Sequence, residues 1–220
     1  MIEKTCVVYQ APPGFVIWNL IPAPEAGSMV IEERNDATRK VAITCVEFFG
    51  KVQWRNANLP ESWWINLNAV TNAQVILRLF ESTANPDAVR LIALTLTTGE
   101  VSEIAPGSAH TIQPLRPFVY VQGEPEFETV QNFLQQKLGQ MAFLGAEYLE
   151  TETWIFISYY IGQPANFTNV LACFGRDGKL CWTEEFGTNL KGMGVGTFFI
   201  ATNTLFFVKN KTELVTFRIV

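Results

Sequence analysis

The chain has only one histidine, His110, among its 220 residues. A single histidine excludes a metal site built from several imidazoles, and it permits a Ser-His-Asp triad only through that one residue. His110 follows Gly107 and Ser108 in a turn-like stretch, without a positioned nucleophile or an orienting partner beside it in the sequence. We therefore interpret His110 as a surface residue and expect no metal site and no catalytic residue of this kind.

Cysteine is also scarce. The four cysteines, Cys6, Cys45, Cys173 and Cys181, include no C-x-x-C pair and no adjacent pair. This spacing is typical of small buried hydrophobic residues in a reducing compartment, not of metal ligands or a redox centre. We expect a cytoplasmic protein without a cofactor.

Runs of one charge and long apolar runs are missing as well. The net charge is −5, the pI is near 5.0, and the 16 Lys and Arg residues are scattered, so nucleic acid is not an expected partner. Residues 153–175 and 192–208 carry no charge, but Gly162–Asn166 and Thr202–Thr204 interrupt them. Neither run supplies the ~20 continuous apolar residues of a membrane helix. No apolar stretch typical of a signal peptide precedes Gly14. The sequence thus predicts a soluble protein with no membrane partner.

A short sequence motif recurs along the chain. Glycine is followed four residues later by tryptophan at Gly14–Trp18, Gly50–Trp54 and Gly178–Trp182, and a degenerate copy begins at Gly99. An apolar stretch precedes the last three glycines and places Cys45, Leu94 and Cys173 at equivalent positions. Each unit has the pattern of a β-hairpin, with glycine supplying the positive φ of the turn.

The spacing of these glycines predicts the architecture. The intervals of 36, 49 and 79 residues, the last close to twice 40, indicate a period of about 40 residues, which is the length of a four-stranded propeller blade. The Gly-Lys-x-x-Trp motif after an apolar strand resembles the repeats of quinoprotein-like β-propellers and, more distantly, of the WD-repeat class. The resemblance implies a propeller fold. Enzymes of the quinoprotein family hold their cofactor against adjacent cysteines, which this chain lacks, so the resemblance does not imply the cofactor.

We therefore predict an all-β, propeller-like ring of about five units of roughly 40 residues, forming a single domain over residues 1–220. Residues 126–138 are predicted as one helix, because their apolar positions have helical spacing between Pro125 and Gly139. This helix either replaces blade strands or is inserted between them. We expect the N-terminal strand, Phe15–Leu20, to close the last blade by pairing with Glu213–Ile219, because an open ring would leave two exposed edges.

The aromatic residues fall into two groups. Trp18, Trp54 and Trp182 are equivalent in the repeat, which favours a shared structural role in packing between sheets. The adjacent pairs are different, because neighbouring strand residues face opposite ways and one of each pair should be exposed. We predict that these pairs contribute to a binding surface: Trp63, Trp64, Tyr159 and Tyr160.

These features favour a non-catalytic recognition or scaffold module of unknown specificity, with a protein or a small molecule as its partner. The alternative is a glycoside hydrolase or lyase whose carboxylates come from separate blades. Within Glu32–Glu33 and Glu184–Glu185 the two side chains should face opposite ways, so neither pair supplies two carboxylates to one pocket. Convergence of carboxylates with His110 or Arg116 would favour the enzyme. The glycine-rich stretch Gly192–Gly196 precedes a strand and not a helix, so we interpret it as a flexible turn and not as a phosphate loop.

Overall fold

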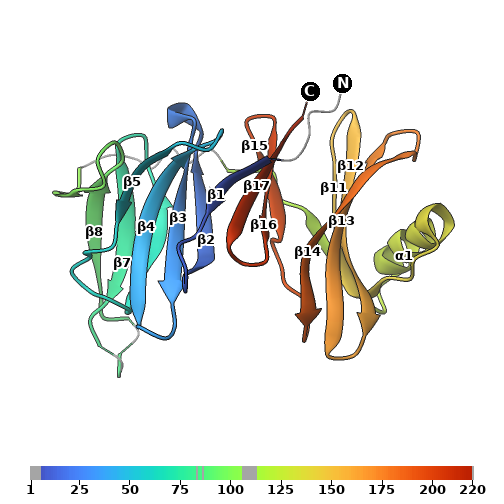
Figure 1. Ribbon diagram of the computed structural model, residues 1–220, viewed down its shortest axis with the longest axis horizontal. Coiled ribbons are helices and arrows are strands. Elements are labelled where there is room, and N and C mark those ends of the chain that lie inside the picture. Colours follow the sequence, from blue (N-terminus) through green and yellow to red (C-terminus); the bar gives the residue numbers. More distant parts are fainter. Residues whose placement is uncertain (1–5, 83, 86, 106–112, 220) are drawn as a thin grey trace. The chain divides into compact units, whose positions relative to one another are not determined.

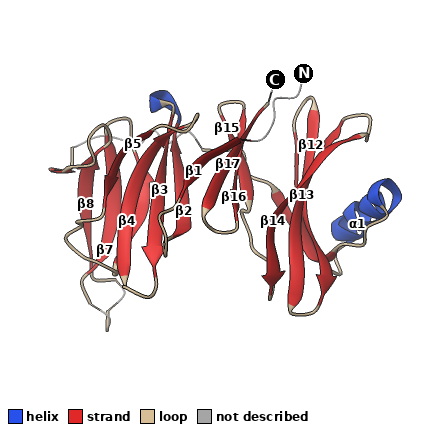
Figure 2. Cartoon of the chain, viewed as in Figure 1, coloured by secondary structure: helices blue, strands red, loops and turns tan. Residues whose placement is uncertain are grey.

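A computed structural model describes residues 6–82, 84–85, 87–105 and 113–219. The chain divides into two compact units. The first contains described residues of 1–114, 201–204 and 211–220, and the second contains those of 115–200 and 205–210. His110 and the Gly107–Ser108 stretch before it lie outside the described residues. Nearly all of the regular structure is strand (Figure 2).

Antiparallel sheets that follow the order of the chain make up most of both units (Figure 1). In the first unit, one sheet has the order β2 (Val16–Ala23), β3 (Ser28–Asn35), β4 (Lys40–Glu47) and β5 (Val52–Asn56). A short 3-10 turn, Pro24–Ala26, joins β2 to β3. The next sheet has the order β6 (Ile65–Val70), β7 (Gln74–Phe80), β8 (Val89–Thr95) and β9 (Val101–Ser102).

The second unit contains a five-stranded sheet with the order β10 (Phe118–Val121), β11 (Phe143–Glu150), β12 (Trp154–Gln163), β13 (Asn166–Gly175) and β14 (Leu180–Leu190). The remaining strands of the chain are β1 (Cys6–Gln10), β15 (Phe198–Ala201), β16 (Thr204–Lys209) and β17 (Glu213–Arg218). The predicted all-β, propeller-like class is confirmed, because each complete sheet is an antiparallel meander of the blade type. The assignment of both units to a single domain stays a prediction.

The repeated motif forms the β-hairpins that the sequence predicts. Gly50, Gly99 and Gly178 have φ angles of 104°, 73° and 74° in the turns that lead into β5, β9 and β14. The equivalent upstream residues also have equivalent partners: Cys45 is opposite Trp54, Leu94 is opposite Val101, and Cys173 is opposite Trp182. Cys45, Leu94 and Cys173 are all fully buried. The repeat in the sequence therefore corresponds to a repeated β-hairpin in the structure.

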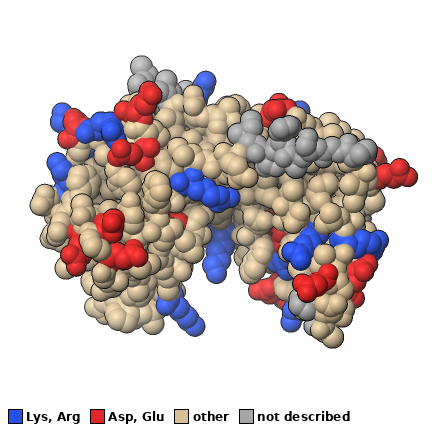
Figure 3. Space-filling model, turned by 180° about the vertical axis from the view of Figure 1, so that it is seen from behind, with Lys and Arg blue, Asp and Glu red and all other residues tan. Residues whose placement is uncertain are grey.

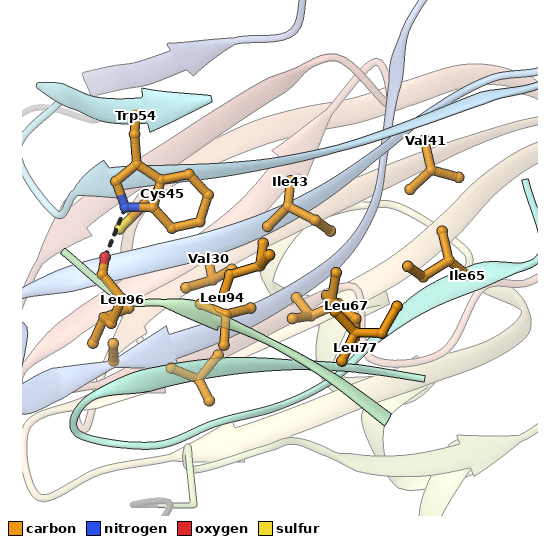
Figure 4. Close-up of a cluster of buried hydrophobic side chains, with 14 of the residues drawn as sticks. Val30, Val41, Ile43, Cys45, Trp54, Ile65, Leu67, Leu77, Leu94 and Leu96 are labelled. Atoms are coloured by element: carbon orange, nitrogen blue, oxygen red, sulfur yellow. Dashed lines mark hydrogen bonds between the residues drawn. The ribbon is translucent and has the colours of Figure 1, made fainter. Parts of the chain in front are cut away.

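Trp54 connects the two sheets of the first unit. Its indole N–H donates a hydrogen bond of 2.7 Å to the carbonyl of Leu96, which directly follows β8 of the second sheet (Figure 4). A Cβ atom on Gly99 would lie 2.4 Å from the ring of Trp54, so only glycine permits this approach. The ring lies in a continuous core that includes Val30, Ile43 and Leu77, as Figure 4 shows. The predicted packing role is thus confirmed for Trp54.

The N-terminal pairing differs from the prediction. Phe15–Leu20 does not pair with the C-terminal strand, because β2 pairs along its length with β3, from Val16 opposite Arg34 to Ala23 opposite Ser28. The strand that pairs with β17 is β1, with Cys6 opposite Thr216 and Gln10 opposite Glu213. Pro12 and Pro13 separate β1 from β2, and the short turn after β2 makes β3 its nearest partner.

The predicted helix is α1, Pro125–Leu138, and it is inserted between β10 and β11. Proline occupies its first turn, and Gly139 ends it with a φ of 68° and an N–H that donates to the carbonyl of Gln135. Its buried side chains are Phe127, Val130 and Leu134, which pack on the five-stranded sheet. None of the described helices has the length and apolar character that a membrane span requires.

Replacing Leu134 with aspartate should lower the free energy of unfolding by roughly 3 kcal/mol or more, because Leu134 is fully buried and a carboxylate there has no partner. Asn132→Asp, on the exposed side of the same helix, is the matched control and should change stability by less than about 0.5 kcal/mol. Urea denaturation followed by circular dichroism measures both. Equal midpoints for Leu134→Asp and the parent protein would show that α1 does not pack on the sheet.

Candidate functional site

Strand β3 carries two consecutive glutamates, Glu32 and Glu33, and both are fully buried. A buried carboxylate requires a cation or several hydrogen bonds. Glu32 accepts a hydrogen bond of 2.6 Å from the guanidinium of Arg34, two residues along the same face of the strand, and one of 2.7 Å from the backbone N–H of Leu67. Glu32 therefore fixes the position of Arg34.

Arg34 lies between two tryptophan rings. Its Cζ is 5.2 Å from the ring centroid of Trp18 and 5.0 Å from that of Trp63. The Cζ of Arg39 lies 4.9 Å from the same Trp63 ring. The order Trp18, Arg34, Trp63, Arg39 thus alternates aromatic rings and cations, and we call these four residues the Trp–Arg stack. Each contact has the geometry of a cation–π interaction.

A β-bulge directs Trp18 outward. The pairing of β2 with β3 shifts between Ile17 and Asn19, which leaves Trp18 as the extra residue on the edge strand. A bulge re-aims the side chain that it contains. Trp18 is accordingly 63% exposed, and the packing role predicted for it from the repeat is wrong. Trp182, the third equivalent residue, is half-buried with its ring centroid 6.4 Å from that of Phe156.

Glu61 positions the two predicted tryptophans, Trp63 and Trp64. Its carboxylate accepts hydrogen bonds from the backbone N–H groups of Trp63 (2.9 Å) and Trp64 (3.3 Å). The hydrogen bond from Trp63 is the main cause that lowers the pKa of Glu61. Trp63 is half-buried in the Trp–Arg stack, whereas Trp64 is 51% exposed. Trp63 and Trp64 therefore differ in exposure as the sequence predicts.

The other predicted pair is buried. Tyr159 and Tyr160 are both inaccessible, although they face opposite ways from β12. Tyr159 belongs to the core beneath α1, and Tyr160 exchanges hydrogen bonds with the backbone of Gly194. The expectation that one of them is exposed is wrong, because this central strand is covered on both faces. A binding role for the four aromatic residues stays a prediction.

The buried carboxylates serve the structure. Glu33 accepts hydrogen bonds from the Tyr9 hydroxyl, from Thr44 at 2.6 Å and from the guanidinium of Arg55 at 2.9 and 3.1 Å. Burial first, and then this bond to Glu33, raise the pKa of Tyr9 well above its ordinary range. Glu32 and Glu33 thus have separate partners on opposite faces, as predicted. Glu184 of the other acidic pair binds Lys209.

A third buried carboxylate, Glu147, was not identified from the sequence. It accepts hydrogen bonds from the backbone N–H of Gly196 and from both the N–H and the hydroxyl of Thr197. The Thr197 hydroxyl also contacts that of Ser158, at 2.9 Å. The glycine-rich stretch predicted as a flexible turn is therefore tied to the sheet, and its amides bind a carboxylate of the protein itself.

The described residues contain no group of three or more His, Cys, Asp or Glu side chains that could hold a metal ion. All four cysteines are free thiols. Cys45 and Cys173 are buried, as predicted, whereas Cys6 is exposed and Cys181 is only half-buried, so the expectation of buried cysteines is wrong for these two. Burial raises the pKa of Cys45 to about 11, so this thiol stays protonated at neutral pH. On the face drawn in Figure 3, acidic and basic side chains are interspersed.

Comparisons with known proteins give little functional information. A family model described as "Domain of unknown function (DUF4905)" matches residues 23–102, which include the first two complete sheets except for the start of β2. No curated protein matches the chain. Among solved structures, BamB from Moraxella catarrhalis is similar over 99% of both chains, at 9% sequence identity and a TM-score of 0.31.

Proposed function

We propose that this chain is a non-catalytic recognition module that binds another protein through the Trp–Arg stack. The observation that carries the proposal is the alternation of Trp18, Arg34, Trp63 and Arg39, in which the first tryptophan is exposed while buried groups hold the middle of the stack. Tryptophan and arginine dominate the binding energy of protein interfaces, and a rigid side chain loses little entropy when it binds.

The stack is ordered before any partner arrives. Arg34 donates to Glu32 and to the carbonyl of Ile65 at 2.8 Å, and its side chain is only 13% exposed. Arg34 is therefore a fixed spacer between two rings, not a mobile surface arginine. Such pre-organisation favours recognition because the cost of ordering the side chains is met during folding.

The charge of the stack indicates the chemistry of the partner. Arg39 is exposed and forms no ion pair with any described carboxylate, so its cation is available. The ring of Trp18, at the other end of the stack, offers a large apolar area. The partner that fits is a protein surface with a carboxylate that pairs with Arg39 and an apolar side chain that covers Trp18.

Quantitative affinity capture tests this proposal. The immobilised chain and its Trp18→Ala and Arg39→Ala variants are incubated with lysate of the native organism, and captured proteins are compared by mass spectrometry. We expect a protein that the parent chain retains and that both variants lose by more than about tenfold, as for interface hot spots. Direct binding to the purified protein then confirms the contact.

Phe49→Ala is the matched control, because Phe49 is 75% exposed in the same unit and does not belong to the stack. It should capture the partner as the parent chain does. Trp64→Ala tests separately whether this exposed tryptophan contributes, as the sequence predicts. A capture profile that is unchanged by Trp18→Ala and Arg39→Ala would contradict the proposed function.

A further inference from the structure

A pocket of about 310 Å³ lies in the second unit, between helix α1 and strands β10, β11 and β12. Its volume is at the lower end of the range for small-ligand sites, roughly 300–1,000 Å³. Three aromatic side chains line it: Tyr120, Phe133 and Tyr148. None of these residues belongs to the Trp–Arg stack, so the pocket raises a question beyond the proposed function.

The aromatic walls are held in place by neighbours. The rings of Tyr120 and Tyr148 have centroids 6.3 Å apart with an interplanar angle of 34°. Phe133 packs edge-on against Phe174, with centroids 5.0 Å apart. Val130, Ile155 and Ile157 supply the remaining apolar lining. The interior therefore suits a flat or aliphatic apolar group and offers π faces to it.

One charged side chain lines the pocket, and it is acidic. Glu126 belongs to the first turn of α1 and forms neither a hydrogen bond nor an ion pair with another described side chain. Among the hydroxyl groups of the lining residues, that of Thr129 donates to the carbonyl of Pro125 and that of Tyr148 donates to Glu150. The nearby cations lie outside the lining: Arg176 pairs with Glu150 at 2.9 Å, and Lys137 Nζ lies 5.9 Å from the centroid of Phe133.

We propose that this pocket binds a small organic ammonium ion that carries an apolar body. The apolar body would occupy the space between the three rings, and the ammonium group would pair with Glu126. Aromatic faces and a free carboxylate are the two features that attract an alkylammonium group, whereas an anion of the same shape would be repelled by Glu126. Both features converge here on residues of α1 and β10–β12.

Titration with three probes of one shape tests the charge requirement. The probes are 2-phenylethylammonium, the neutral 2-phenylethanol and the anionic 3-phenylpropionate, followed by ¹H–¹⁵N NMR of the full chain at pH 7. We expect saturable shifts in α1 and β10–β12 with the ammonium probe, with a Kd from high micromolar to about 5 mM, as befits so small a ligand. The alcohol should bind several-fold more weakly, and the carboxylate should not bind.

Two variants assign the site. Glu126→Gln should weaken the ammonium probe about threefold to fivefold and leave the alcohol unchanged, since a partly exposed ion pair contributes a modest amount. Glu128→Gln, in the same helical turn but outside the lining, is the matched control and should have no effect. Thr129→Trp, at an exposed position that lines the pocket, should fill the pocket and abolish binding of both probes while the protein stays folded.

Three results would overturn the proposal. They are the absence of saturation by the ammonium probe up to about 20 mM, equal binding of all three probes, and an ammonium affinity that neither Glu126→Gln nor Thr129→Trp lowers. Capture by the Trp–Arg stack does not depend on these residues. The failure of this inference and the failure of the proposed function are therefore distinguishable.

Discussion

Replacing Trp54 with alanine is expected to lower the free energy of unfolding by about 3–5 kcal/mol. Trp54 fills the core between the first two sheets, its indole N–H is paired with the carbonyl of Leu96, and its ring packs on Gly99. The substitution leaves a cavity and removes the donor from a buried carbonyl, so two costs add. Urea denaturation followed by far-UV circular dichroism gives the change in free energy.

Trp64→Ala is the matched control, because Trp64 is 51% exposed and its indole N–H forms no hydrogen bond with a described residue. It should change stability by less than about 1 kcal/mol. If Trp54→Ala unfolds at the same urea concentration as the control, then the tryptophan of the repeated motif does not hold the two sheets together.

Replacing Glu33 with alanine is expected to cost about 3–5 kcal/mol, the usual range when one partner of a buried ion pair is removed. Glu33 is fully buried, and the change leaves Arg55 without its carboxylate and the hydroxyls of Tyr9 and Thr44 without their acceptor. Chemical denaturation at pH 7 measures the effect. The exposed pair of Glu47 and Lys51, with an N–O distance of 3.8 Å, provides the control.

Glu47→Ala should change stability by less than about 1 kcal/mol, because solvent screens an exposed pair. A double variant, Glu33→Leu with Arg55→Leu, should recover part of the stability lost in Glu33→Ala, since it leaves no unpaired charge. Near-equal stability of Glu33→Ala and Glu47→Ala would show that Glu33 is not the buried acceptor of this network.

The sequence predicts those features of the fold that depend on local pattern. The glycine turns at Gly50, Gly99 and Gly178, the burial of Cys45 and Cys173 and the helix that ends before Gly139 follow from residue types at fixed spacing. The sequence pattern of a strand does not by itself predict which strand it pairs with. Phe15–Leu20 has a strand pattern, but its pairing with β3 is decided by the short connection to β3.

The candidate site was predicted only in part for a similar reason. Trp63 and Trp64 are conspicuous in the sequence, whereas Trp18 is exposed because of a bulge that only the register of β2 against β3 reveals. Tyr159 and Tyr160 show the reverse error, since burial of both depends on what covers each face of the sheet. Alternation of side chains predicts direction, not exposure.

Arg34 had one signal that was available from the sequence. Glu32 and Arg34 are two residues apart in an apolar strand, so their side chains share a face and can pair. Arg39 had no comparable signal, because its contact with Trp63 joins a hairpin to a connection 24 residues later in the chain. Such contacts depend on tertiary structure.

The Kd of the purified partner for the chain, measured by calorimetry with the parent protein, Trp18→Ala and Phe49→Ala, tests the central claim most directly. We predict that Trp18→Ala raises the Kd about 30-fold or more, the loss typical of an interface hot spot, and that Phe49→Ala changes it less than about twofold. Equal Kd values for Trp18→Ala and the parent protein would show that the Trp–Arg stack is not the surface that the partner recognises.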